Sequence, residues 1–447
     1  MTCKATLTNF LEEHYALLGI LIGAVLVSIS LGPYSNFDSE TEFAAASSVV
    51  NLGAPYSTPG NLINQPPIGF YIDAVFLKIF GLSYATGVGI TMLFGVGCIL
   101  LVYKLGKIFY GVKTGLLAAG ILALTPWHII LSRSFLIDTQ CLFFSLLYLI
   151  VGIWAIRKAS LKLFLISGTL FGIALMEKLF AVFMLIPLLL IYLSSIPKKL
   201  ERSLKEMFLF ITPSILFYYL WYGVISQLGV FSIFSHDDFS RFSPADIAPS
   251  PFFIVSYFAG NPGVLFFLAA GISVVVTVWK RKHFTKIFFS DMVCLVTISG
   301  VVSVNLYLVL VQSLWVPYVD PVKYEYQLLP AFCLLVASLA PKAYSVAYST
   351  YSEIKRRKLI LAVAIVGLAL LAGSILLNIG RLQALTRTDY LLFRVEGDIS
   401  YSFVRLTPTI AHEYLAALQG LGILIVVISL LWKNGNVQLY DKKKTEF

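Results

Sequence analysis

"HYALLGILIGAVLVSISLG", residues 14–32, is a long apolar run near the beginning of the chain. A hydrocarbon core about 30 Å thick needs roughly 20 apolar residues in a helix, so this run is long enough to cross a bilayer. It is followed by "NFDSETEF", residues 36–43, which contains three carboxylates. The pair of segments predicts a membrane helix with ionisable side chains at the membrane surface.

Similar apolar runs recur along the whole chain. Of its 447 residues, 58% are hydrophobic and 13% are charged, whereas soluble domains carry about 25% charged residues. The composition predicts an all-α integral membrane protein, with residues 1–447 forming a single polytopic domain of about 12 transmembrane helices. The predicted spans are 14–32, 83–103, 114–131, 139–156, 162–176, 179–196, 206–225, 262–279, 289–313, 326–342, 358–377 and 414–432.

The basic residues indicate how the chain is oriented. Lys and Arg gather in both tails and in the short loops at one set of span ends, whereas carboxylates favour the other side. This positive-inside asymmetry predicts a multi-pass protein of the cell membrane with both termini in the cytoplasm. It also accounts for the net charge of +10 without nucleic acid as a partner.

Three segments are predicted to lie outside the membrane: 33–82, 226–261 and 381–412. The first is expected to contain two juxtamembrane surface helices, at 39–52 and 67–81. Ser39 and Glu42 have capping-box spacing for the first helix, and Pro66 and Pro67 can open the second. The second helix is short for a span and is expected to lie in the membrane interface, with Asp73 away from its apolar face.

The acids after the first span allow two interpretations. Carboxylates in a first helical turn are stabilised by the helix dipole, which explains acids here without any catalytic role. Alternatively, Asp38 or Glu40 is a general base at the membrane surface, while Glu42 serves as the cap. Both interpretations remain open on the residues alone.

Further ionisable residues lie at the outer ends of predicted spans. Such residues are costly beside a bilayer and often mark a substrate path. The alternative is that they are end-caps that reach water. Cations at the headgroup level can bind a phosphate, and the residues concerned are Arg133, Asp138, Glu177, Lys178, Lys323, Tyr324 and Glu325.

Five motifs resemble, in order, those of one family: "DSETEF" (38–43), "NQPPIGF" (64–70), "SRSFLIDTQCLFF" (132–144), "GIALMEK" (172–178) and "KYEYQLLPA" (323–331). Their order and spacing are similar to those of GT-C membrane glycosyltransferases, in the branch of protein O-mannosyltransferases and lipid A aminoarabinose transferases. Aligned on Phe43, Glu40 matches the family's Glu, whereas Ser39 stands where the family has Asp. Gln65, Glu177 and Lys323 replace a Lys or His, a Thr and an Arg.

The resemblance implies a GT-C-type bundle and the transfer of a sugar from a polyprenyl- or dolichyl-phosphate donor to an acceptor hydroxyl, on a protein or a lipid or glycan, at the outer face. Asp38 or Glu40 would be the base and the product would be inverted. The implied substrate-binding residues are Gln65, Arg133, Asp138, Lys178, Lys323 and Tyr324. Membrane lipids would be further partners.

The rival interpretation is a multi-pass transporter or flippase, since twelve spans are a common carrier layout; the absence of recognisable repeated halves disfavours it. A non-catalytic subunit is a third interpretation. The isolated cysteines form no disulfide or zinc pattern. No cofactor is predicted with certainty: a divalent metal ion is the one candidate, and "HDD" at 236–238 fits a solvated loop better than its site.

Overall fold

The computed structural model describes residues 2–35, 37–63, 65–194, 200–227, 326–331, 333–334 and 337. This part of the chain is mostly helical. The predicted spans from 262 to 313 and from 358 onward, most of the span at 326–342, the segment 381–412 and nearly all of 226–261 lie outside the described residues. The total of about 12 spans therefore remains a prediction.

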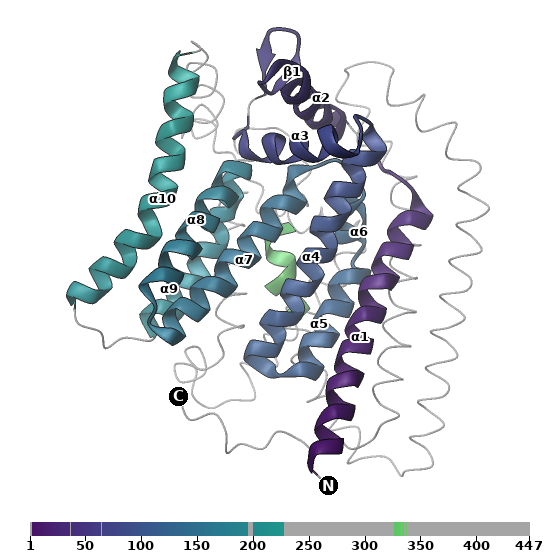
Figure 1. Cartoon of the computed structure of the whole chain (residues 1–447), viewed down its shortest axis with the longest axis vertical. Coiled ribbons are helices and arrows are strands. Elements are labelled where there is room, and N and C mark those ends of the chain that lie inside the picture. Colours follow the sequence, from purple (N-terminus) through teal and green to yellow (C-terminus); the bar gives the residue numbers. More distant parts are fainter. Residues whose placement is uncertain are drawn as a thin grey trace, which may run out of the picture.

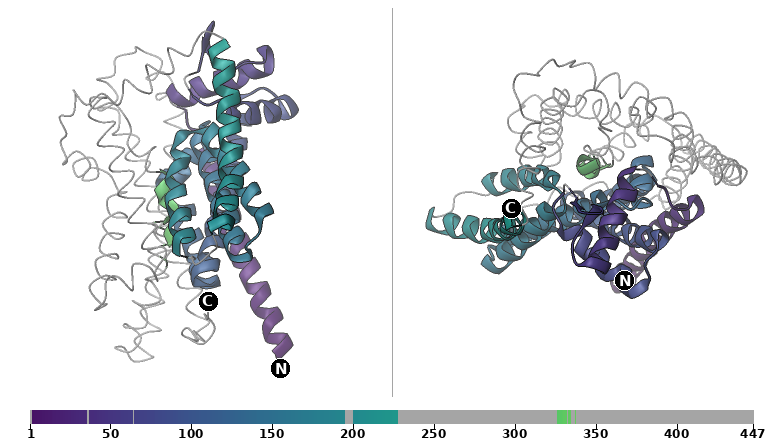
Figure 2. Two further views of the ribbon diagram at one scale, coloured as in Figure 1. Left: turned by 90° about the vertical axis from the view of Figure 1, so that its left-hand side faces the viewer. Right: turned by 90° about the horizontal axis from the view of Figure 1, so that it is seen from above.

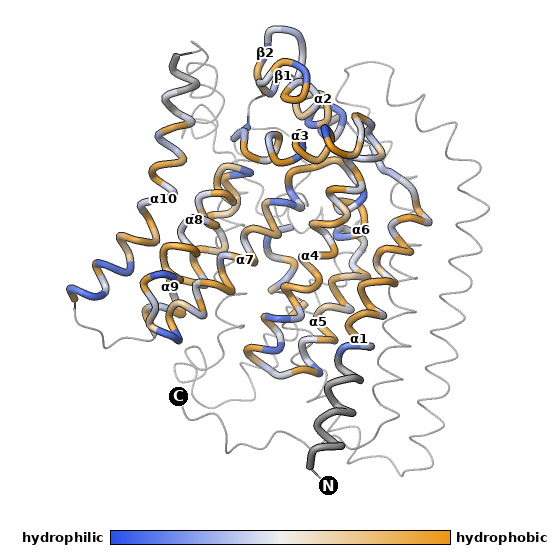
Figure 3. Tube along the Cα trace, in the orientation of Figure 1, coloured by the Kyte–Doolittle hydropathy of each residue, from blue (hydrophilic) through white to orange (hydrophobic). Residues whose placement is uncertain are grey.

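Long helices stand side by side and form a bundle (Figures 1 and 2). Within the described part of the chain, three of them are long and apolar enough to cross a membrane: α1 within His14–Leu31, α4 and α7. Figure 3 shows hydrophobic residues along much of these helices. The bundle elements are α1 (Thr2–Leu31), α4 (Tyr84–Tyr110), α5 (Val112–Leu124), α6 (Pro126–Ser132), α7 (Ile137–Lys158), α8 (Leu161–Glu177), η1 (Leu179–Met184), α9 (Leu185–Ser194) and α10 (Leu200–Gln227).

The predicted span 114–131 is divided into α5 and α6. A residue before proline is disfavoured in the helical region, and Thr125 has extended backbone angles, φ −70° and ψ 124°. Pro126 then begins α6, where its missing N–H costs no helical hydrogen bond. The predicted span 179–196 begins with the 3₁₀ turn η1, which follows the extended residue Lys178.

Two helices lie across one end of the bundle: α2 (Phe37–Leu52) and α3 (Ile68–Phe80), joined by a hairpin of β1 (Tyr56–Thr58) and β2 (Asn61–Leu62) (Figure 1). They correspond to the helices predicted at 39–52 and 67–81. Gly53, which directly follows the last residue of α2, has a positive φ of 79°. We call α2, the hairpin and α3 the surface platform.

The face that α3 turns to the bundle is the one that contains Asp73. Asp73 is buried with Phe70, Ala74 and Leu77, whereas Tyr71 and Val75 are exposed. The spacing of these four buried residues places them on one helical stripe. The prediction that Asp73 lies away from the broader apolar stripe is confirmed: α3 packs through the narrower stripe that contains Asp73 and leaves the broader one outside.

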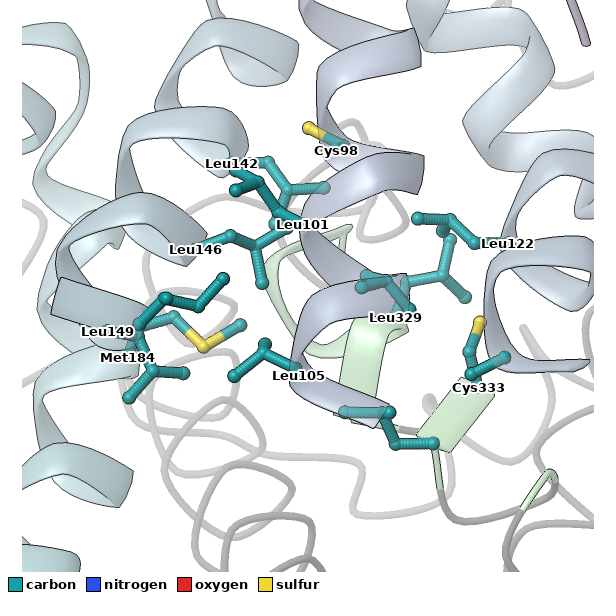
Figure 4. Close-up of a cluster of buried hydrophobic side chains, with 14 of the residues drawn as sticks. Cys98, Leu101, Leu105, Leu122, Leu142, Leu146, Leu149, Met184, Leu329 and Cys333 are labelled. Atoms are coloured by element: carbon teal, nitrogen blue, oxygen red, sulfur yellow. The ribbon is translucent and has the colours of Figure 1, made fainter. Parts of the chain in front are cut away.

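Apolar side chains hold the bundle together. Figure 4 shows Leu101 and Leu105 of α4 facing Leu142 and Leu146 of α7. The short element η3 (Tyr326–Leu328) and the described residues that follow it pack on the same core. A second cluster joins the platform to the bundle and contains Ala45, Ala46, Ile63, Phe70, Leu77, Val88, Ile90, Phe135 and Ile137.

Candidate functional site

The platform contacts the bundle at the first turn of α7, and Glu42 makes one of these contacts. Its buried carboxylate oxygen Oε2 accepts a hydrogen bond of 2.9 Å from the backbone N–H of Ile137. The first N–H groups of a helix have no partner within the helix, and Leu136, the residue before α7, supplies no side-chain cap. Glu42 of α2 therefore caps another helix, α7.

The predicted capping box of Ser39 and Glu42 is thus wrong. Ser39 is the third residue of α2 instead of the residue before it. Its buried hydroxyl accepts a hydrogen bond of 2.9 Å from the hydroxyl of Tyr84. Sequence spacing alone could not reveal this, because the partners of both side chains come from distant segments.

Asp138, the second residue of α7, forms an ion pair with Lys178. The distance from Lys178 Nζ to Asp138 Oδ2 is 2.8 Å, and the two residues are only 8% and 2% exposed. Lys178 follows the end of α8 with an extended backbone, and its ammonium also lies 5.9 Å from the centre of the Phe180 ring. Two of the predicted site residues, from separate motifs, are therefore in direct contact.

Gln140, on the same turn of α7, contacts the other platform helix. Its side-chain Nε2 donates a hydrogen bond of 2.5 Å to Asp73 Oδ1 of α3. Burial raises the pKa of Asp73 well above its ordinary value; the hydrogen bond from Gln140 opposes this shift, and the carboxylate of Glu42 adds to it. Asp73 is therefore held in its protonated form over a wider pH range than an exposed aspartate.

Glu177 completes this group of buried acids. It is fully buried, and a side chain at Gly69 would collide with its carboxylate, so the glycine permits α3 to approach α8. Glu177 interacts electrostatically with Asp73 and Glu42. Of these three acids, the sequence offers only Glu177 as a marker of a substrate path, whereas it predicts Glu42 as a cap and gives Asp73 no role. The apolar neighbours of Asp73 on its stripe are a usable signal for that residue.

Asp38 and Glu40 lie in the first turn of α2 and are exposed. Glu40 Oε1 accepts a hydrogen bond of 2.7 Å from the hydroxyl of Ser35. The placement agrees with helix-dipole stabilisation and also leaves both carboxylates accessible for chemistry. The choice between Asp38 and Glu40 stays open.

Arg133 closes the end of α1. Its Nη1 donates hydrogen bonds of 3.0 Å each to the carbonyls of Leu31 and Gly32, and its guanidinium lies 5.5 Å from the centre of the Tyr34 ring. These carbonyls belong to the C-terminal end of a helix, where no helical partner is available. The side chain predicted to bind substrate is thus engaged in fastening α1 to the bundle.

Three predicted site residues remain: Gln65, Lys323 and Tyr324. Gln65 is half-buried between β2 and α3, and its Oε1 has no hydrogen-bond partner among the described residues. Lys323 and Tyr324 lie outside the described residues. The motif that contains them continues at Tyr326, whose hydroxyl lies 2.7 Å from Nδ1 of the buried His128 in α6.

Where the structure describes the chain, no group of three or more His, Cys, Asp or Glu side chains is arranged to hold a metal ion. The buried acids Glu42, Asp73 and Glu177 therefore do not form a metal site in this arrangement.

Residues 64–222 match the family "Dolichyl-phosphate-mannose-protein mannosyltransferase". Among curated proteins, "Putative mannosyltransferase YycA" of Bacillus subtilis (strain 168) is 30% identical over 148 residues, which are 33% of this chain and 22% of the relative. "Putative mannosyltransferase YkcB" of the same organism is 30% identical over 130 residues, 29% of this chain and 18% of the relative. The chain thus covers about a fifth of the curated relatives that it matches.

Among solved structures, the crystal structure of ArnT from Cupriavidus metallidurans bound to undecaprenyl phosphate has a TM-score of 0.57 at 14% identity, covering 93% of this chain and 76% of that one. Its apo state gives a TM-score of 0.57 at 15% identity, covering 92% and 76%. At this identity the likeness establishes the fold. Together with the family match, it confirms the resemblance predicted from the sequence, to the GT-C membrane glycosyltransferases of the protein O-mannosyltransferase and aminoarabinose transferase branch.

Proposed function

We propose that this chain is a glycosyltransferase that moves a hexosyl or pentosyl group from a polyprenyl- or dolichyl-phosphate donor to an acceptor hydroxyl on a protein, lipid or glycan. One observation carries the proposal: the buried Asp138–Lys178 pair lies at the end of the bundle where α2 presents Asp38 and Glu40. We place this end at the outer membrane face, with both termini in the cytoplasm.

Lys178 is the proposed partner of the donor phosphate. An ammonium group has three N–H donors, and the contact with Asp138 occupies one of them. Asp138 compensates the buried charge and orients Lys178, while the remaining donors can contact phosphate oxygens. Gln65, Lys323 and Tyr324 are proposed to contact the donor or the acceptor, and Arg133 to contribute through its hold on α1.

The proposed reaction is a single displacement. A carboxylate, Asp38 or Glu40, removes the proton of the acceptor hydroxyl, whose oxygen attacks the anomeric carbon. The bond from that carbon to the phosphate oxygen breaks, and the polyprenyl phosphate leaves with the bonding electron pair. Lys178 stabilises the charge that develops on the leaving phosphate. One displacement inverts the anomeric configuration.

The test is transfer by the purified full chain in liposomes that contain radiolabelled mannosyl-, glucosyl- or arabinosyl-phosphoryl-undecaprenol and membrane extract as acceptor. We expect one donor to be consumed, with label in an acceptor and free undecaprenyl phosphate released. Movement of the intact labelled lipid between leaflets without transfer would contradict the proposal and favour a flippase.

A further inference from the structure

We infer that Glu42 is a positioning residue: it fixes the base-bearing helix α2 against the turn of α7 that carries Asp138. The inference rests on the proposed function and extends it to a residue outside the reacting groups. Its basis is the hydrogen bond of 2.9 Å between Glu42 Oε2 and Ile137 N–H.

The bond joins the two halves of the proposed site. On the α2 side, Glu42 follows Asp38 by four residues, and residues with this spacing lie on one face of a helix. On the α7 side, Ile137 directly precedes Asp138, which contacts Lys178 at 2.8 Å. A displacement of α2 relative to Ile137 would therefore change the separation of the candidate base from the ion pair.

The surroundings of the bond favour a fixed geometry. Glu42 and Ile137 are 1% and 0% exposed, so water does not compete for the hydrogen bond. The same turn of α7 is held from a second side, where Gln140 donates to Asp73 of α3. Hydrogen bonds thus connect both platform helices to one turn of α7, and that turn sets the position of the platform on the bundle.

Two substitutions separate positioning from a role of the negative charge. Glu42→Gln keeps the length of the side chain and an acceptor oxygen but removes the charge. Glu42→Asp keeps the charge but is one methylene shorter, so it can reach Ile137 N–H only if α2 moves. If Glu42 positions α2, the Gln variant should transfer sugar at a rate within about threefold of wild type, and the Asp variant should lose about tenfold or more in kcat, since small misplacements are costly.

Ser160→Ala is the matched control. The Ser160 hydroxyl caps α8 by accepting from Leu163 N–H at 3.4 Å, so its loss also removes a helix cap, but at the other end of that helix from Lys178. The variants are compared at equal folded protein, judged by thermal unfolding in detergent. Transfer by Ser160→Ala should remain at the wild-type rate.

Two outcomes would overturn the inference. If Glu42→Asp is active and Glu42→Gln is not, the charge of Glu42 matters and its reach does not. If Ser160→Ala loses as much transfer as Glu42→Asp, cap loss alone explains the effect. Should wild type transfer none of the donors, the proposed function fails, and amide hydrogen exchange at Ile137 N–H decides for Glu42: exchange should be faster in the Asp variant than in the Gln variant, and equal exchange refutes positioning.

Discussion

Lys178 and Asp138 lie forty positions apart in the chain, yet Lys178 Nζ is 2.8 Å from Asp138 Oδ2. Both come from helix ends: Asp138 from the first turn of α7, and Lys178 from the residue after α8. A buried ion pair is weak evidence for stability, because desolvation offsets much of the attraction. We therefore propose that the ammonium group of Lys178 has a functional role, the contact with the donor phosphate.

Replacing Lys178 with Met should remove the proposed contact between its ammonium group and the donor phosphate. Loss of one donor to a developing oxyanion typically lowers turnover by about 10²–10³-fold, and we expect an effect of this size in the transfer assay. Because Lys178→Met leaves Asp138 buried without its partner, the double variant Lys178→Met with Asp138→Asn is the appropriate comparison for folding. Recovery of stability without recovery of transfer is expected, whereas wild-type transfer by the double variant would exclude the phosphate role.

The sequence predicted the elements well and the contacts of single polar residues less well. Apolar runs and proline positions are local signals, so the helices at 14–32, 83–103 and 139–156 and both platform helices were predictable. The motifs "SRSFLIDTQCLFF" and "GIALMEK" also indicated that Asp138 and Lys178 belong to one site. The partners of Ser39 and Glu42, by contrast, depend on how α2 is placed on α4 and α7, which no local spacing encodes.

Asp38 and Glu40 can be separated as candidate bases by Asp38→Asn and Glu40→Gln. Removing a general base lowers turnover by about 10²–10⁴-fold, and we expect this loss at Asp38 and a smaller one at Glu40, because the family that the chain resembles uses an Asp as its base. The measurement is initial transfer rate in matched membranes. Ser35→Ala is the control for the Glu40 hydrogen bond, and a large loss at Glu40 alone would make Glu40 the base.

Arg133→Ala should destabilise the protein, because two helix-end carbonyls lose a charged donor. Hydrogen bonds to charged groups contribute about 1.5–3 kcal/mol each, so a clear drop in the thermal midpoint is expected. Arg133→Lys can still donate to these carbonyls and should recover part of the loss. If Arg133→Lys unfolds like wild type but no longer binds undecaprenyl phosphate, Arg133 contacts the donor directly.

The orientation of the platform can be tested by cysteine labelling in sealed cells. Asn61 lies in the hairpin, and Lys162 lies near the opposite end of α8; both are exposed. In a chain with Cys3 and Cys294 changed to Ser, an impermeant maleimide should label Asn61→Cys and not Lys162→Cys, since Cys98, Cys141 and Cys333 are buried. Labelling of Lys162→Cys alone would place the platform in the cytoplasm. Ser39 also belongs to the predicted external segment 33–82, but it is unsuitable for labelling because it is buried.

The buried carboxyl of Asp73 predicts a pH dependence of stability. Burial raises its pKa in the folded state, despite the hydrogen bond from Gln140, so the folded chain holds this proton at pH values where the unfolded chain has lost it. Stability from this group is therefore greatest below the ordinary pKa of an aspartate and is lost as pH rises through the folded-state pKa. Asp73→Asn keeps an oxygen for Gln140 and cannot ionise. Its thermal midpoint in detergent should rise relative to wild type as the pH is increased from about 4 to 8. A difference that is constant with pH would show that Asp73 has an ordinary pKa in the folded protein.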